Sequence, residues 1–202
     1  MKIALLIEGQ TERAFLRHLR RFLEIRLAGQ MPRLDPEPYD GRIPKGERLR
    51  REVERLLRSG TPPADAVIAL TDVYTGTSDF QDAQDAKNKM REWVGDDPRF
   101  FPHAAQHDFE AWLIPFWGSI QRLAGHNMAA PGGSPEAVNH MHPPSVRIER
   151  IFRAGTCKRD YVKPRDAERI LRENDLSVAA AACPELRAFL NTILRLCGGN
   201  DV

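Results

Sequence analysis

The stretch that decides the fold is "IALLIEGQTERAF", residues 3–15. Its short apolar run, rich in β-branched residues, is typical of a strand buried on both faces of a parallel sheet. The run ends at Glu8, and apolar residues then recur with a helical period as far as Leu27, with Thr11 as the expected N-cap and Glu12 in the first turn. The stretch therefore predicts a strand, a tight turn and a helix.

The same alternation continues along the chain. A charged amphipathic helix is predicted over residues 45–60, a second apolar strand ends on Asp72, and a helix follows from about Phe80 to Val94. A further short strand is expected around residues 37–39. This order predicts an α/β fold with a mainly parallel central sheet and helices on both faces.

The last part of this pattern changes character. The segment "RFFPHAAQHDFEAWLIPFWGSI" predicts a strand that runs into a helix near Glu110 or Ala111. Beyond it, proline, glycine and asparagine become frequent, so the C-terminal third is expected to be irregular and helical, with helices near residues 164–174 and 184–196.

Bulk properties limit the class of protein. A chain of 202 residues favours a single domain, and 30 basic against 28 acidic residues indicate that any nucleic-acid site is local. The N-terminal apolar run is too short to span a membrane. The three cysteines form no close pair, which argues against a disulfide framework or a zinc ribbon and favours a cytoplasmic protein. The cysteines are Cys157, Cys183 and Cys197.

Two acids end predicted strands, Glu8 and Asp72. Ligands of open parallel sheets gather outside the carboxyl ends of the strands. If the two strands are neighbours, the carboxylates converge as Mg²⁺ requires, since this ion takes one or two carboxylates together with water and a substrate phosphate. The partial positive charge of a helix N-terminus accounts for Glu12 without any chemistry, but it does not account for Glu8.

Asp108 and Glu110, in "HDFEAW", form a second acidic pair. In an extended segment, their spacing of two places both on one face and brings them to the same edge of the sheet. The alternative is a strand-end acid followed by an ordinary acid in the first turn of a helix, and the sequence leaves both open.

A zinc site is an alternative built on histidines. His103 and His107 have the spacing of a zinc-binding helix but lack its glutamate, and "NHMHPP" offers a loop pair, His140 and His142. The sequence contains no phosphate-binding loop of the NTPase or dinucleotide type, which argues against a self-contained enzyme of either class.

Basic residues are frequent late in the chain, and near the acids they would contact phosphates and stabilise transition-state charge. The alternative is a solvated helix face. The basic residues are Arg147, Arg150, Arg153, Lys158, Arg159, Lys163 and Arg165. The residues selected as candidates for phosphate or substrate binding are Asn139, Ser145, Arg147, Lys158 and Lys163.

Six motifs in this order resemble a known family. "IEGQTE" resembles the E-G-x-T-E signature of Toprim domains, specifically those of overcoming-lysogenization-defect (OLD) type nucleases, and the closer likeness is to the bacterial domain of unknown function 4276 (DUF4276). The motifs are "EGQTE", "TDVYTG", "QHDFEAWL", "PEAVNHMHPPSVRIERIF", "YVKP" and "CPELRAFL".

The resemblance implies one Toprim-like Rossmannoid domain, with a core of about residues 1–118 and a family-specific extension of about residues 119–202. It also implies a nuclease or phosphodiester hydrolase dependent on Mg²⁺ or Mn²⁺. Nucleic acid is the expected substrate class, a separately encoded ATPase is a possible partner, phage defence is the possible setting, and a homodimer is left open. The implied catalytic residues are Glu8, Asp72 and Lys163, and the implied metal ligands are Glu8, Glu12, Asp72, Asp108 and Glu110.

One residue departs from the Toprim pattern. Where the family generally has D-x-D, this chain has "DVY", so Tyr74 replaces the second aspartate. A phenol stays protonated at neutral pH and is a poor Mg²⁺ ligand. The site is therefore expected to hold one metal, with Asp108 or Glu110 supplying the missing charge, or to be a degenerate module that only binds nucleic acid or an ATPase partner.

Overall fold

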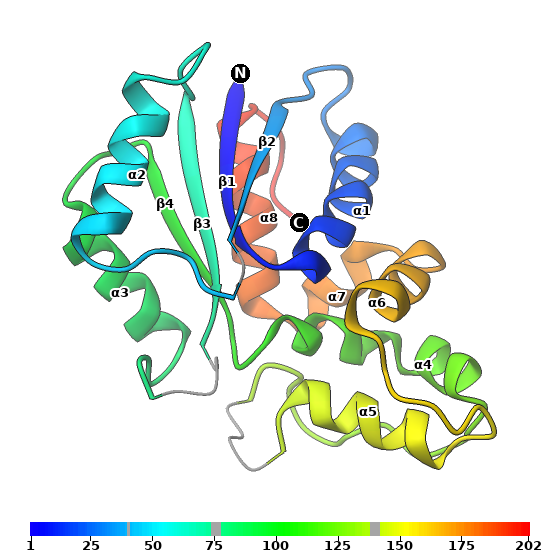
Figure 1. Ribbon diagram of the computed structural model, residues 1–202. Helices are drawn as coiled ribbons and strands as arrows, with labels where there is room; N and C mark the ends of the chain where they lie inside the picture. The colour runs from blue at the N-terminus through cyan, green and yellow to red at the C-terminus, as the bar shows by residue number, and fades with distance from the viewer. Residues whose placement is uncertain (40, 74–77, 138–141) are drawn as a thin grey trace.

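A four-stranded parallel sheet forms the centre of the protein. The computed structural model describes residues 1–39, 41–73, 78–137 and 142–202. The strands are β1 (Lys2–Glu8), β2 (Arg33–Tyr39), β3 (Ala66–Asp72) and β4 (Phe100–Ala105). They lie in the order β2-β1-β3-β4 (Figure 1). The predicted α/β class is confirmed, and the strands that end on Glu8 and Asp72 are neighbours.

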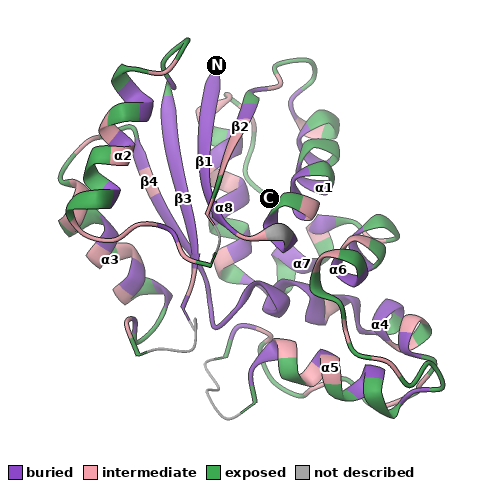
Figure 2. Ribbon diagram, in the orientation of Figure 1, coloured by how far each residue is buried: buried purple, intermediate pink, exposed green. Residues whose placement is uncertain are grey.

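Each face of the sheet buries its own apolar cluster. Successive β1 side chains, such as Leu5 and Leu6, belong to different clusters because neighbouring residues of a strand point to opposite faces of the sheet. Helices α1 (Gln10–Arg26) and α8 (Pro184–Leu196) pack in the first cluster, and helices α2 (Glu47–Arg58) and α3 (Ala83–Val94) pack in the second. Burial on both faces explains the uninterrupted apolar sequence of β1 and β3 (Figure 2).

The part of the chain that follows β4 is largely helical, and its apolar side chains extend the first cluster. It contains the 3₁₀-helix η1 (Phe109–Phe116), α4 (Trp117–Ala124), α5 (Pro144–Ala154), α6 (Lys163–Arg172) and α7 (Leu176–Ala182). Apolar residues of all five helices join those of α1 in one core. Helices α4 and α5 lie beyond the carboxyl edge of the sheet (Figure 1). In the described ranges, no helix is both long and apolar enough to cross a bilayer.

Three element boundaries differ from those expected. Helix α1 begins at Gln10 with Gly9 as its N-cap residue, so Thr11 is not the cap. Strand β2 extends well beyond the expected residues 37–39, because it pairs with the whole of β1. Helix α3 begins only at Ala83, because the side chain of Asp82 accepts a backbone hydrogen bond and caps it.

Gly9 permits the abrupt turn from β1 into α1. Its backbone has φ 86° and ψ −169°, a region that only glycine adopts without strain. Only Gly9 separates the end of β1 from the start of α1, so Glu8 and Glu12 lie close together along the chain on either side of this turn. A Cβ atom on Gly9 would lie 3.5 Å from a Glu12 carboxylate oxygen.

Glu136 ties η1 to the start of α8. Its buried carboxylate accepts hydrogen bonds from the indole Nε1 of Trp112 at 2.8 Å and from the backbone N–H of Glu185 at 2.9 Å and of Leu186 at 3.3 Å. Two of these donors belong to the first turn of α8, whose partial positive charge also favours a carboxylate. Glu136 thereby fixes the position of η1 relative to the sheet.

Replacing Glu136 with alanine should lower the free energy of unfolding by about 2–4 kcal/mol, since three donors, two of them in buried hydrogen bonds, lose their acceptor. Urea denaturation monitored by circular dichroism measures the change. The matched control is Glu54→Ala, which removes a partly exposed α2 carboxylate that pairs with Arg50 at 3.8 Å and should change stability by less than about 1 kcal/mol. Equal losses in the two variants would contradict the proposed tie.

Candidate functional site

The site lies at the carboxyl edge of the sheet, where β1, β3 and β4 end. Glu8 is the last residue of β1, and Asp72 is the last residue of β3, opposite Ala105 of β4. The chain then continues from β4 into the segment that carries Asp108 and Glu110. Glu8, Asp72, Asp108 and Glu110 therefore all lie at or directly after the carboxyl ends of strands in the same sheet.

Glu8 is held in a defined orientation. Its carboxylate is buried and accepts hydrogen bonds from the Thr71 hydroxyl and, at 3.3 Å, from the backbone N–H of Ile43. Burial raises the pKa of Glu8, while these two bonds and the positive charge of Arg42 oppose the rise. Neighbouring strand and loop groups thus support the charged form of a carboxylate that burial disfavours.

Asp72 is affected by the charges of the other four predicted acids. Burial raises its pKa well above the ordinary value, and the negative charges of Glu12, Glu8, Asp108 and Glu110 raise it further. The structure thus places these acids within electrostatic reach of Asp72, without three of them gathered around one point in the described ranges.

Glu12 and Glu110 are also buried and strongly affected. Burial and the charges of Glu110 and Glu8 raise the pKa of Glu12 to about 8. Burial and the charge of Asp108 raise the pKa of Glu110 to about 7. Glu12 lies in the first turn of α1, where a backbone hydrogen bond lowers its pKa as a helix N-terminus should, but burial and the neighbouring acids outweigh this effect.

Lys163 brings a positive charge to these acids. It is the first residue of α6, and its Nζ lies 3.1 Å from a carboxylate oxygen of Glu110. Burial lowers the pKa of Lys163, but the charges of Glu110 and Asp108 outweigh that effect and raise it. The ammonium group is therefore fully charged at neutral pH and half exposed, which leaves it able to contact a substrate.

Asp108 has one buried oxygen without a partner. Its Oδ2 accepts a hydrogen bond from the Ser145 backbone N–H at 3.3 Å, and its buried Oδ1 accepts none in the described part of the chain. Buried polar atoms in native proteins are usually paired, so an unpaired carboxylate oxygen indicates a missing ligand. Asp108 occupies the N-cap position of η1 without capping it, which leaves this oxygen available.

The local geometry of this acidic pair differs from the extended strand considered above. His107 has a left-handed φ of 75°, Asp108 is extended, and Glu110 lies in the first turn of a 3₁₀-helix. A sharp turn at His107 therefore determines the direction of the two acids. The alternation of side chains along an extended strand does not determine it.

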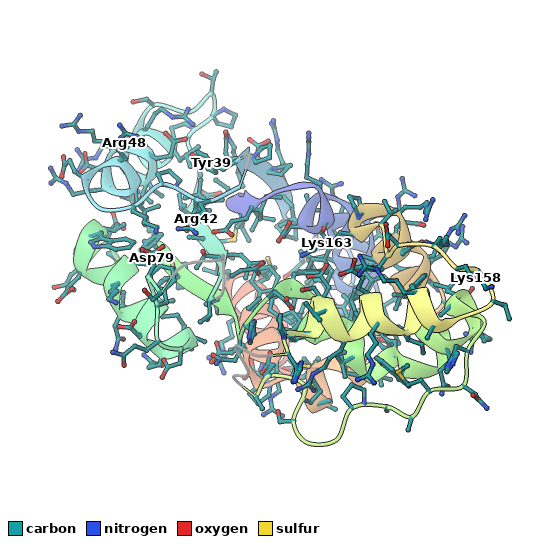
Figure 3. All side chains as sticks on the ribbon, turned by 60° about the horizontal axis from the view of Figure 1, so that its bottom comes forward. Tyr39, Arg42, Arg48, Asp79, Lys158 and Lys163 are labelled. Atoms are coloured by element: carbon teal, nitrogen blue, oxygen red, sulfur yellow. The ribbon has the colours of Figure 1, made fainter. Side chains whose placement is uncertain are left out.

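Most of the late basic residues serve other purposes. Arg159 and Arg165 hydrogen-bond the fully buried carboxylate of Asp166. Lys158 lies far from Lys163, at the other end of the connection between α5 and α6 (Figure 3). Lys163 is the predicted basic residue for which the structure shows a direct bond to the acids.

Four further residues named in the sequence analysis need separate comment. Arg147 donates a hydrogen bond to the His142 carbonyl at 2.9 Å, and Ser145 reaches the site through its backbone N–H. Asn139 and Tyr74 lie outside the described residues, so the family departure at Tyr74 keeps its sequence interpretation.

Sequence reasoning missed a second basic group, on the segment that joins β2 to α2. Arg42 and Lys45 both contact Asp79 at 2.5 Å, and Arg42 acts electrostatically on Glu8. With the exposed Arg48 they line a hollow of about 610 Å³ beside Tyr39. Arg42 and Lys163 lie on either side of the sheet edge (Figure 3). The sequence did contain a pattern that could have indicated this group: three basic residues, at every third position, follow directly after a predicted strand.

The donor set suits Mg²⁺ better than zinc. In the described ranges, no three His, Cys, Asp or Glu side chains are arranged to hold a metal ion as they stand. Zinc needs three or four such ligands, whereas Mg²⁺ takes one or two carboxylates together with water and phosphate. His103 instead lies 3.0 Å from the Thr192 hydroxyl, and burial lowers its pKa to about 3. Glu8, Asp72 and the unpaired oxygen of Asp108 are carboxylate oxygen donors, the ligand type that Mg²⁺ prefers.

Comparisons with known proteins agree with this fold. The family model described as "Domain of unknown function (DUF4276)" matches residues 7–194. The C-terminal region of the Burkholderia pseudomallei OLD protein is similar over 97% of this chain and 98% of that one, with 13% identity and a TM-score of 0.53. The corresponding region of the Xanthomonas campestris pv. campestris OLD protein aligns over 98% and 96%, with 14% identity and a TM-score of 0.47. No curated protein sequence matches the chain.

The raised pKa of Glu12 predicts a pH-dependent penalty on stability. That pKa is about 8 in the folded protein against an ordinary 4.5, so the folded protein keeps a proton that the unfolded chain releases. Stability is therefore lost as the pH rises from 4.5 through 8. Glu12→Gln should be more stable than wild type by about 2–4 kcal/mol at pH 8 and nearly equal at pH 4.5, in urea denaturation with EDTA.

The matched control is Glu24→Gln, which alters an exposed glutamate on the same helix and should leave stability unchanged at both pH values. A Glu12→Gln protein no more stable than wild type at pH 8 would show that the acids do not repel one another as described.

Proposed function

The chain belongs to the DUF4276 family, and on that premise we propose that it is a nuclease that hydrolyses phosphodiester bonds with Mg²⁺ or Mn²⁺ at this acidic site. The observation that carries the proposal is the action of the charges of Glu12, Glu8, Asp108 and Glu110 on Asp72, together with the contact of Lys163 with Glu110. Such strongly shifted groups in one place are typical of functional sites.

Electrostatics supports a bound divalent cation. Buried carboxylates that repel one another destabilise a fold unless a counter-charge is supplied, and a single lysine cannot neutralise five acids. We assign Glu8 and Asp72 as the principal metal ligands, with Asp108 or Glu110 supplying further charge. Glu12 is the less certain partner and is placed to support a second ion.

The chain's own groups have distinct roles in this proposal. When bound, the ion would polarise a phosphoryl oxygen and lower the pKa of the attacking water. Glu8, fixed by Thr71 and Ile43, is oriented to hold the ion or to accept a proton from that water. Lys163 stabilises the negative charge that develops on the phosphoryl oxygens.

The basic segment before α2 supports a nucleic acid as the substrate. Arg42, Lys45 and Arg48 lie on the β2 side of the acids, and Lys163 lies on the other side. Positive charges on both sides of a hydrolytic centre suit a polymer with phosphates before and after the scissile bond. The near-neutral charge of the whole chain agrees with a local contact surface of this kind.

The biological setting is proposed from the relation to OLD proteins. The solved relatives are C-terminal regions of longer proteins, and this chain aligns over nearly all of one such region. We propose that the protein works in the cytoplasm beside a separately encoded ATPase, as part of phage defence.

The alternative function is a non-catalytic module that binds nucleic acid or an ATPase. Tyr74, which replaces the second aspartate of the Toprim pattern, favours this alternative because a phenol is a poor Mg²⁺ ligand.

Cleavage assays distinguish the two functions. Wild type should cleave DNA or RNA in Mg²⁺ or Mn²⁺, and Glu8→Gln and Asp72→Asn should each lower the rate by about 100-fold or more because the ion loses a ligand. Mg²⁺ should also raise the melting temperature of wild type more than that of either variant. Glu24→Gln serves as the control and should retain the wild-type rate.

Absence of cleavage by wild type on single-stranded DNA, duplex DNA and RNA, or equal cleavage by Glu8→Gln, would contradict the nuclease. A co-purifying ATPase without any Mg²⁺-dependent thermal shift would then favour the binding module.

The basic segment gives a separate prediction. Arg48→Gln should weaken binding of a DNA or RNA strand and reduce the salt dependence of binding by about one released counterion. Fluorescence anisotropy in EDTA over a series of KCl concentrations measures both. Arg51→Gln is the matched control, because Arg51 lies one turn away, is 75% exposed and pairs with Glu47. Equal effects of the two substitutions would exclude a specific contact at Arg48.

A further inference from the structure

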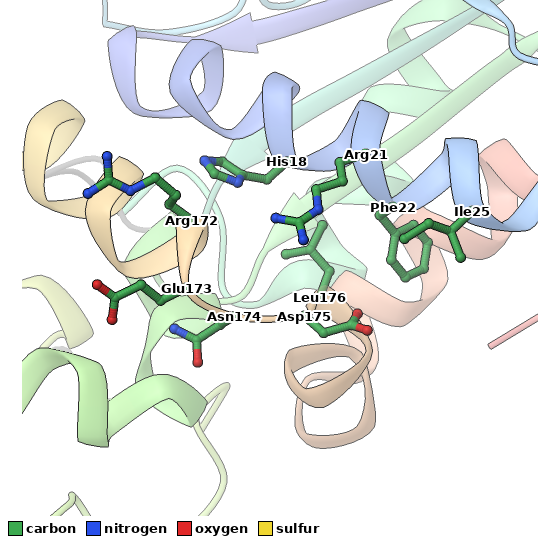
Figure 4. A pocket seen from close by; sticks show the side chains of 9 residues that line it. All are labelled: His18, Arg21, Phe22, Ile25, Arg172, Glu173, Asn174, Asp175 and Leu176. Atoms are coloured by element: carbon green, nitrogen blue, oxygen red, sulfur yellow. The ribbon is translucent and has the colours of Figure 1, made fainter.

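A second polar pocket lies on α1, away from the acidic edge. It has a volume of about 270 Å³ and sits where α1 meets the end of α6 and the start of α7 (Figure 4). One wall is apolar and is formed by Phe22, Ile25 and Leu176. Ile25 is 71% exposed, which is unusual for a large aliphatic side chain on an otherwise ordered helix. The pocket thus combines an apolar wall with polar groups.

His18 forms the inner polar wall. The side chain is only 7% exposed, and its Nε2 is buried without a hydrogen-bond partner in the described part of the chain. Buried polar atoms in native proteins are usually paired, so this nitrogen of a pocket-lining residue is a candidate for a hydrogen bond to a ligand.

Two arginines flank His18. Arg21 comes from α1 and Arg172 from α6, and both line the pocket on either side of the imidazole (Figure 4). Burial lowers the pKa of His18, the charge of Glu168 opposes this effect, and the charges of Arg17, Arg21 and Arg172 add to it. No ion pair or side-chain hydrogen bond joins Arg21 or Arg172 to another described residue, whereas Arg26 of α1 bonds the Ser177 hydroxyl at 2.6 Å. The pocket therefore contains two guanidinium groups without a direct partner among the described residues, and Asp175 interacts with Arg21 only through its charge.

The acids at the rim are engaged elsewhere. Glu173 pairs with Arg122 at 2.8 Å, and Asp175 caps α7 by accepting hydrogen bonds from the backbone and hydroxyl of Ser177. Neither carboxylate is paired with the two pocket arginines. The two guanidinium groups therefore keep their hydrogen-bond donors available, and Arg guanidinium groups are well suited to phosphate oxygens.

We propose that this pocket binds the phosphate monoester of a nucleotide, with Arg21 and Arg172 holding the phosphate oxygens and His18 donating or accepting a further hydrogen bond. The apolar wall suits the nucleoside part. The phosphate is carried either by a free mononucleotide or by the 5′-phosphorylated end of a nucleic-acid strand, since both present the same group.

The placement of the pocket connects it to the acidic site. Helix α1 carries Glu12 at its start and His18 and Arg21 further along, and helix α6 carries Lys163 at its start and Arg172 at its end. A phosphate held by both arginines therefore bridges the two helices that contribute Glu12 and Lys163.

Isothermal titration calorimetry on the full chain tests the proposal. The probes are adenosine 5′-monophosphate against adenosine, and a 5′-phosphorylated oligonucleotide against the same strand with a 5′-hydroxyl. EDTA and a Glu8→Gln background keep metal-dependent binding at the acidic edge out of the measurement, so the result does not depend on nuclease activity.

At least one phosphorylated probe should bind more tightly than its unphosphorylated counterpart by about tenfold or more, and Arg21→Gln and Arg172→Gln should each remove that preference. His18→Gln should weaken it less, because one hydrogen bond is changed. Arg51→Gln is the control, since Arg51 lies on α2 outside the pocket and is 75% exposed.

Preference for the phosphorylated strand alone would assign the pocket to nucleic-acid ends, and binding of the mononucleotide would assign it to a free nucleotide. No preference for either phosphorylated probe, or an equal loss in Arg51→Gln, would overturn the proposal. Thermal melts of each variant confirm that the pocket substitutions leave the protein folded.

Discussion

Repulsion among buried carboxylates is the constraint around which this protein is built. The carboxyl edge of a parallel sheet carries Glu8 and Asp72 at the ends of neighbouring strands, and two further segments carry Glu12 and the pair after β4. The charges of the other four acids and burial disfavour the ionisation of Asp72. Under the proposed function, a cation and a phosphorylated substrate supply the charge and hydrogen bonds that this edge lacks.

The rest of the fold supplies the stability that this group of acids lowers. Two apolar clusters, one on each face of the sheet, supply the stability that the acids reduce. Gly9 turns the chain within one residue, Thr71 and Ile43 orient Glu8, and Glu136 fastens η1 to α8. Interactions outside the acidic centre thus determine where its carboxylates lie, which agrees with a site that must be held rigidly before a ligand binds.

Helices α1 and α6 link the two polar regions of the molecule. They pack against each other along the first cluster, and each begins with a charged residue of the acidic site. The phosphate pocket proposed further along the same pair carries the opposite charge. Acids at one end and arginines at the other suit a protein that handles phosphorylated polymers or their products, with the two ends contacting different groups.

The sequence by itself determined the alternation of strands and helices, because apolar periodicity and chain punctuation are local properties. It also identified Glu8 and Asp72, since parallel strands must end at a common edge whatever their loops do. Only the tertiary structure decided that Arg42 stands beside Glu8, that a left-handed His107 aims the next acids inward, and that Arg21 and Arg172 share a pocket. These contacts either join residues that are far apart in the chain or depend on the conformation of a single turn. A periodic pattern of apolar residues predicts neither kind of contact.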